Sequence, residues 1–179
     1  MELPSYRLPA PKSVLRLVWD KAKDFITRAF TIIFVASLAI WFLQTFDARF
    51  NVAANSGQSL LAAAGRLIAP IFAPLGFGSW QFSTALITGF TAKEAVVSTL
   101  AVLTGSSMAN LPAALSGALS PAAALAFLTF TLLYTPCVAA VAAVKREMGG
   151  ARRALFVVCY QTGVAWLAAF LVYRLALLF

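Results

Sequence analysis

The chain has 179 residues, of which 61% are hydrophobic and only 11% are charged, and its net charge is +8. Soluble domains carry about 25% charged residues, so this composition excludes an ordinary soluble protein and indicates an integral membrane unit. We expect an all-α polytopic protein of about five membrane-spanning helices. The chain has no histidine, which excludes imidazole metal sites, and its two cysteines provide no disulfide framework.

The first 28 residues predict a basic lead-in on the cytoplasmic side of the membrane. Residues 1–12 contain three prolines and are expected to be extended. Residues 14–27 alternate apolar and charged side chains with helical periodicity, which is typical of an amphipathic helix at the membrane interface. The basic residues here and in the loop 145–153 lie beside apolar segments, as the positive-inside bias predicts. We therefore expect lipid as a partner and no nucleic acid, and place a membrane module at residues 29–179.

Five apolar segments follow, and they predict the membrane spans. They cover residues 29–46, 60–77, 80–103, 120–144 and 154–179. The second contains an arginine and two prolines and is a poor uninterrupted helix, and a tight turn is expected at residues 76–79. Residues 104–119 predict an uncharged loop.

Counting crossings from a cytoplasmic N-terminus gives a topology. The basic loop 145–153 is then cytoplasmic, and the loop 104–119 lies outside. Residues 60–103 must begin and end outside. Two crossings or a pair of re-entrant hairpins satisfy this condition, and both alternatives remain open.

Two charged residues, Lys93 and Glu94, lie near the middle of the third apolar segment. A charge at this depth costs about 2.5–3.5 kcal/mol on the insertion scale, so such residues usually face protein or a water-filled cavity and mark an ion or substrate path. Lys93 needs a partner, either a carbonyl or an acid on another helix. For Glu94 the alternative to a path ligand is a structural ion pair.

Hydroxyl side chains accompany these charges. On a continuous helix five of them fall on one face, with Glu94 at its edge and Lys93 opposite. They are Thr84, Thr88, Thr91, Ser98 and Thr99. Such a stripe suits a cation path, although each hydroxyl can instead bond its own backbone. Gly89 permits a helix break one turn before Lys93, in which case freed backbone groups would add to the site.

The fourth apolar segment contains a second interruption, Thr135-Pro136-Cys137. Pro136 removes one helical hydrogen bond and displaces the carbonyl of Leu132, which needs a partner in lipid. Thr135 or a permeating cation would supply one. A thiol at Cys137 is a soft ligand that suits a first-row transition metal, whereas simple apolar packing is the alternative role, which we assign to Cys159.

At these residues the chain resembles a known family. The matching pieces, in order, are MELPSYRLP, WDKAKDFITRAFTIIF, GFTAKEAVVSTLAVL, LYTPCVAAVAAVKREMG and QTGVAWLAAFLVYR. They resemble the second Gate (nucleoside-recognition-like) membrane module of the ferrous iron transporter family FeoB. The resemblance implies passage of Fe²⁺, as transported ion and not as cofactor, across the bacterial inner membrane. It also implies that Cys137, the cysteine of the family's Pro-Cys motif, lines the path.

The resemblance also sets the expected partners. Members carry a GTP-binding domain and a first Gate module that this chain does not contain, so we expect those parts, or a homo-oligomer, to complete the transporter. The chain itself is expected not to be an enzyme, and no phosphate-binding loop, HExxH or serine triad is present. Two alternatives are a carrier of nucleosides or another small solute, for which Tyr160 and Gln161 offer the aromatic and amide groups, and a non-transport assembly scaffold.

Overall fold

The structure is a computed structural model that describes residues 10–134 and 137–178. Every regular element in these ranges is helical, which confirms the predicted all-α class, and the two strand-like residues form one isolated bridge. The α-helices are α1 (Pro11–Thr45), α2 (Leu60–Phe72), α3 (Trp80–Gly89), α4 (Ala95–Thr104), α5 (Leu111–Ala118), α6 (Pro121–Leu133), α7 (Val138–Glu147) and α8 (Ala151–Ala176). Two short 3₁₀ helices, Ser56–Gln58 and Ala73–Leu75, precede and follow α2.

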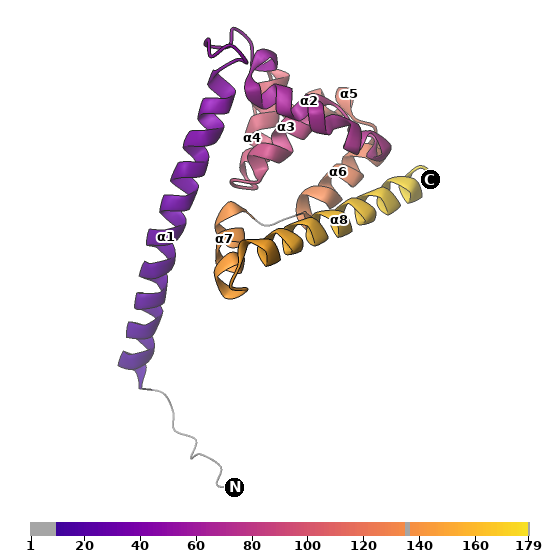
Figure 1. The fold of residues 1–179 in the computed structure, drawn as a ribbon. Helices are drawn as coiled ribbons and strands as arrows, with labels where there is room; N and C mark the ends of the chain where they lie inside the picture. The colour runs from indigo at the N-terminus through magenta and orange to yellow at the C-terminus, as the bar shows by residue number, and fades with distance from the viewer. Residues whose placement is uncertain (1–9, 135–136, 179) are drawn as a thin grey trace.

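Helix α1 joins the predicted interfacial helix and the first apolar segment into one helix of 35 residues. It begins at Pro11, so the expectation of an extended chain through residue 12 is wrong there. Proline is compatible with the first helical turn because the N–H that it lacks has no intrahelical partner in that turn. Figure 1 shows α1 along one side of the molecule, with its C-terminal end near α2 and its N-terminal half projecting away.

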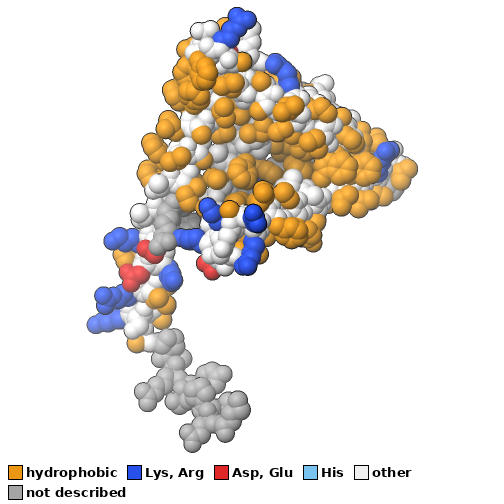
Figure 2. All heavy atoms as spheres, in the orientation of Figure 1, with side chains coloured by type: hydrophobic (Ala, Val, Ile, Leu, Met, Phe, Trp, Pro, Cys, Tyr) orange, Lys and Arg blue, Asp and Glu red, His pale blue; other side chains and the backbone are white. Residues whose placement is uncertain are grey.

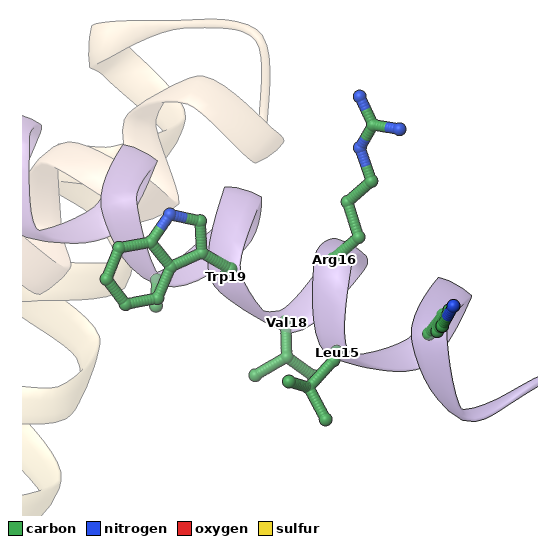
Figure 3. A pocket seen from close by; sticks show the side chains of 6 residues that line it. Leu15, Arg16, Val18 and Trp19 are labelled. Carbon is green, nitrogen blue, oxygen red and sulfur yellow. The ribbon is translucent and has the colours of Figure 1, made fainter.

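The N-terminal half of α1 has an amphipathic surface. Leu15 and Val18 point to one side of the helix and Arg16 to the other (Figure 3). Figure 3 shows a shallow hollow on this part of the molecule. All the side chains that line it belong to α1, so it is a groove on one helix and not a site between elements.

Only α8, among the described helices, is long and apolar enough to cross a bilayer by itself. Two bent pairs reach that length together: residues Leu60–Leu75 with α3, at 105°, and α5 with α6, at 112°. Shorter apolar helices are Phe30–Thr45 and α4. By length and composition, the described part of the chain thus contains one to three candidate spans.

One sequence expectation about loops needs correction. Residues 104–119 were expected to be a loop, but they contain α5, which has a proline in its first turn and whose Leu111 is buried in the core. Helix α2 runs through Pro70 but ends at Phe72, where the 3₁₀ helix Ala73–Leu75 follows, so residues 60–77 are an interrupted helix as expected. The predicted turn at 76–79 is confirmed, and Gly76 has the left-handed φ of 83° that a tight turn needs.

Aromatic side chains form the centre of the core. Phe72 lies edge-on to Phe130, with ring centroids 5.1 Å apart, and Phe130 stacks on Tyr134 at 5.4 Å. Helix α8 closes this core from the side, and the indole Nε1 of Trp166 donates a hydrogen bond of 3.0 Å to the carbonyl of Ile71 at the end of α2. That carbonyl belongs to the last turn of α2, where carbonyls have no intrahelical partner.

Many of the basic side chains gather toward one end of the molecule. Figure 2 shows Lys and Arg side chains gathered on the N-terminal half of α1 and at the loop between α7 and α8, in the lower part of the view. Hydrophobic side chains cover most of the remaining visible surface. The two basic regions thus lie toward the same end, as a cytoplasmic location for both requires.

Candidate ion site at two helix breaks

Two helix breaks meet inside the fold. Helix α3 ends at Gly89 and α4 begins at Ala95, and α6 ends at Leu133 and α7 begins at Val138, with Tyr134 and Cys137 outside both of the latter helices. The first break confirms the alternative that Gly89 permits, so the continuous hydroxyl face expected across residues 80–103 is wrong. A Cβ atom on Gly89 would lie 2.3 Å from Cγ2 of Val96 and 2.6 Å from the hydroxyl of Tyr134. Glycine is therefore needed because α4 and the end of α6 approach the backbone closely here.

Backbone groups freed by one break are bonded by the other. The amide of Val138, the first residue of α7, donates a hydrogen bond of 2.9 Å to the carbonyl of Phe90 after α3. The Tyr134 hydroxyl donates to the carbonyl of Leu86 at 3.4 Å. Helix starts lack intrahelical acceptors and helix ends lack donors, so each contact satisfies a group that its own helix leaves unpaired.

Lys93 satisfies the end of α6. Its Nζ atom donates to the carbonyl of Leu132 at 3.1 Å and to that of Tyr134 at 3.2 Å, and it lies 4.9 Å from the Tyr134 ring centroid. A cation at this position also interacts favourably with the negative end of the α6 dipole. The expectation that Lys93 bonds a carbonyl of another helix is confirmed, and the displaced carbonyl of Leu132 takes Lys93 as its partner.

The two predicted metal ligands occupy matching positions. Glu94 is the N-cap residue of α4, and Cys137 is the N-cap residue of α7. Glu94 is exposed, and among the described residues its carboxylate has no ion pair, so the structural ion-pair alternative finds no support there. Cys137 is half-buried with a free thiol. Thr135 and Pro136 lie outside the described residues.

Within the described ranges, no group of three or more His, Cys, Asp or Glu side chains is close enough to hold a metal ion. A metal at Glu94 or Cys137 would therefore have to complete its shell with backbone carbonyls, hydroxyls or water.

The hydroxyl side chains were expected either to line a cation path or to bond their own backbone, and they differ in which of these roles the structure allows. Thr88 donates to the carbonyl of Ala85 at 2.8 Å and also bonds the hydroxyl of Thr99 on α4 at 2.9 Å. Thr91 returns its hydrogen bond to the carbonyl of Thr88, which is the backbone role. Thr84 and Ser98 instead line a mostly apolar cavity together with Thr99.

Sequence reasoning did not identify Tyr134 as part of this site. It supplies a carbonyl and a ring face to Lys93 and a hydroxyl to α3. Its only sequence signal was its place directly before the Thr-Pro-Cys interruption.

Known protein sequences match most or all of this chain. Residues 26–151 match the Gate family model, described as nucleoside recognition. The chain is 37% identical over 179 residues to the Fe(2+) transporter FeoB of Staphylococcus aureus strain COL, covering 100% of this chain and 27% of the relative. It is 35% identical over 179 residues to the Fe(2+) transporter FeoB of Methanocaldococcus jannaschii, covering 96% and 26%.

A third relative has a fused arrangement. The chain is 33% identical over 228 residues to the Fe(2+) transport protein A/Fe(2+) transporter FeoB fusion protein of Porphyromonas gingivalis, covering 100% of this chain and 27% of the relative. The chain thus spans about a quarter of the length of these relatives. No solved structure matches the chain.

Proposed function

The chain belongs to the Gate family, and from this membership we propose that it is the membrane-permeation half-module of a ferrous iron transporter. Its similarity to proteins named Fe(2+) transporter FeoB extends over the whole chain, which supports Fe²⁺ as the transported ion. The relatives are much longer, which supports further domains as partners: a GTP-binding domain, a first Gate module, or a second copy of this chain. We place the module in the bacterial inner membrane, in contact with lipid, and assign it no enzymatic activity.

The observation that carries this proposal is the meeting of the two helix breaks. Broken helices supply free backbone groups at the centre of many transporters, and such backbone is tolerated only where it is buried in protein or lines a cavity. Here Lys93 is bonded to the carbonyls of α6 rather than to its neighbour Glu94. Because Lys93 does not pair with it, the carboxylate of Glu94 stays available to a passing cation.

The chemistry of the two ligands favours a transition metal. A carboxylate attracts any hydrated divalent cation, whereas the Cys137 thiol discriminates in favour of softer ions such as Fe²⁺ over Mg²⁺ and Ca²⁺. Each is the N-cap residue of the helix after its break, and the hydrogen bond from the Val138 amide to the Phe90 carbonyl joins the two breaks, which supports a single path that includes both.

A substrate panel tests the proposal. We expect the complete protein in proteoliposomes to take up Fe²⁺, and Mn²⁺ or Zn²⁺ more weakly, with no uptake of uridine. The name of the matched family, nucleoside recognition, makes a nucleoside carrier the second candidate. Uptake of uridine without Fe²⁺ would select that candidate, and uptake of neither would leave the scaffold role.

Topology is predicted from the charge distribution. With the α7–α8 loop in the cytoplasm, a cysteine at Arg152 should react with a membrane-impermeant maleimide only from the cytoplasmic side. A cysteine at Ser107 should react only from outside. The measurement is labelling of each variant in right-side-out and inside-out vesicles, in a background without native cysteines. Reaction at position 152 from outside would invert the orientation.

Glu94 is predicted to act in transport and not in folding. Glu94→Gln removes the negative charge and keeps the shape, so the variant should fold normally while Fe²⁺ uptake falls by about tenfold, the loss of one charge-assisted contact. Uptake per folded molecule in proteoliposomes measures this, with Glu147→Gln at the exposed end of α7 as the control. Wild-type uptake by Glu94→Gln would remove Glu94 from the path.

A further inference from the structure

The loop that follows α1 holds an aromatic residue in an unusual backbone conformation. Phe50 has a φ of 59°, and within the described ranges it is the one residue other than glycine with a positive φ. The Cβ of an L-residue crowds the following carbonyl in this left-handed region, so a bulky side chain is an outlier there. The loop lies at the end of α1 that is away from the α7–α8 loop (Figure 1).

Hydrogen bonds hold this loop in a tight hairpin. The amide of Phe50 donates to the carbonyl of Asp47 at 3.1 Å, which closes a β-turn, and Phe46 and Val52 face each other in an antiparallel bridge. The carboxylate of Asp47 accepts two further bonds from loop amides, at 2.8 and 2.9 Å. The commonest β-turn favours aspartate at its first position and glycine at its fourth, so Phe50 stands where glycine is favoured.

The chain itself gives Phe50 little compensation for this conformation. The side chain of Phe50 is 70% exposed, and its ring lies beside the ring of Phe42 on α1, with centroids 6.3 Å apart. A residue in a strained conformation persists only where its surroundings favour it. Because the chain leaves most of this side chain uncovered, the conformation points to a partner outside the chain.

Phe50 belongs to an apolar surface that continues from α1. The ring of Phe42 also lies 4.7 Å from that of Phe46. Val52 is opposite Phe46 in the bridge, so the two side chains leave the same face of the hairpin, and Val52 is 72% exposed. We call Phe42, Phe46, Phe50 and Val52 the loop patch. Further large apolar side chains are exposed at helical spacing along α1 and lead to this patch: Phe30, Phe34, Leu38 and Trp41.

The length of the apolar part of α1 indicates what covers the loop patch. This part is Phe30–Thr45. A rise of about 1.5 Å per residue makes it about 24 Å long, whereas the hydrocarbon core of a bilayer is about 30 Å thick. The loop patch continues the apolar surface where this short helix ends. Arg49, exposed beside Phe50, has the long basic side chain that keeps its charged head at the polar surface of a membrane.

We propose that the loop patch is an anchor that inserts among phospholipid acyl chains and fixes the end of α1 in the membrane, on the predicted outer side. The left-handed conformation of Phe50 directs its ring back to Phe42 and the apolar face of α1. Burial of the exposed ring in lipid is favourable and offsets the strain. This inference rests on the proposed membrane placement of the module and not on the identity of the transported ion.

Photocrosslinking from position 50 tests the anchor. In the complete protein, p-benzoylphenylalanine takes the place of Phe50, which keeps an aromatic side chain that inserts into nearby C–H bonds on irradiation. In proteoliposomes we expect mass spectrometry to find a phospholipid joined to this position. The same replacement at Asn55, an exposed polar residue later in the loop, is the control and should give no lipid adduct. An adduct with a polypeptide in place of lipid, or no adduct, at position 50 would overturn the anchor.

The reactivity of a cysteine at Val52 provides a second measurement. In a background without native cysteines, Val52→Cys in proteoliposomes should react slowly with a membrane-impermeant maleimide. Adding Phe50→Asn should speed this reaction several-fold, because asparagine tolerates the left-handed conformation but has no apolar ring. Phe156→Asn removes a similarly exposed ring from α8 and should leave the rate unchanged. Equal rates with and without Phe50→Asn would contradict the anchor.

Neither measurement requires iron, so failure of the anchor and failure of Fe²⁺ transport are distinguishable. Flotation of the protein with the vesicles checks the membrane placement separately. A lipid adduct at position 50 in a protein without Fe²⁺ uptake would support the anchor and contradict the proposed transport.

Discussion

Replacing Lys93 with methionine is expected to lower the free energy of unfolding by about 2 kcal/mol. The substitution leaves the carbonyls of Leu132 and Tyr134 without the donor that bonds both; the Tyr134 contact is part-buried and the Leu132 contact is exposed, and an unsatisfied buried group costs about 1–3 kcal/mol. The contact with the Tyr134 ring is lost as well. Removing a half-buried charge offsets part of the loss, which is why the expected net effect is smaller than the sum.

Unfolding in mixed micelles by titration with sodium dodecyl sulfate measures this change. Lys93→Arg keeps donors near the end of α6 and should recover at least half of the lost stability. Lys145→Met, at the exposed end of α7, is the control for charge removal and should change little. If Lys93→Met unfolds at the same detergent fraction as wild type, the carbonyl contacts do not hold the two breaks together.

Replacing Gly89 with alanine is expected to destabilise the protein by about 1–3 kcal/mol, the range typical of overpacking. The new methyl group would meet Cγ2 of Val96 at 2.3 Å and the Tyr134 hydroxyl at 2.6 Å. Valine is stiff about χ1 and cannot turn away easily, so the backbone of the break has to shift. Because the break carries Lys93 and Glu94, Fe²⁺ uptake should fall together with stability.

Gly163→Ala in α8 is the matched control for this effect. An added Cβ at Gly163 has no contact within 4 Å, and alanine is favoured over glycine inside a helix by roughly 0.5–1 kcal/mol. That variant should therefore be unchanged or slightly more stable. The double variant Gly89→Ala/Tyr134→Phe removes one of the two close contacts and should recover part of the loss. Equal stability of the two alanine variants would show that α4 and α6 do not approach Gly89 closely.

The sequence could predict the breaks because each has a local chemical cause. A glycine before Lys93 and the proline before Cys137 act on the backbone within one turn, and a lysine within an apolar segment must find a carbonyl or an acid. The all-helical class and the basic end of the molecule follow from composition and charge in the same direct way.

Contacts between distant segments could not be predicted in this way. The bonds from Lys93 to Leu132 and Tyr134 join residues about forty positions apart, and no local periodicity specifies such pairing. Helix α5 was missed because Ser, Gly, Pro and Asn in residues 104–119 resemble a loop, while the burial of Leu111 depends on the rest of the fold.

The distinction between Glu94 and Lys93 is the main functional lesson of the structure. From the sequence, Glu94 could have been either a path ligand or part of a structural ion pair, and Lys93 needed a carbonyl or an acid on another helix. The structure gives Lys93 a role in satisfying the end of α6, and Glu94 keeps its charge at the start of α4. Adjacent residues thus have separate roles, one positioning the breaks and one available to the ion.

Fe²⁺ uptake by Cys137→Ser, compared with Cys159→Ser, tests the central claim most directly. Both free thiols lie in apolar segments, but Cys159 is an exposed residue within the continuous helix α8, whereas Cys137 begins α7 after a break. If the Cys137 sulfur contacts passing Fe²⁺, serine should lower uptake per folded molecule by at least about tenfold despite its similar size, because the harder oxygen is a poorer ligand. Cys159→Ser should retain wild-type uptake. Equal retention of uptake by both variants would contradict the claim, and would remove Cys137 from the iron path.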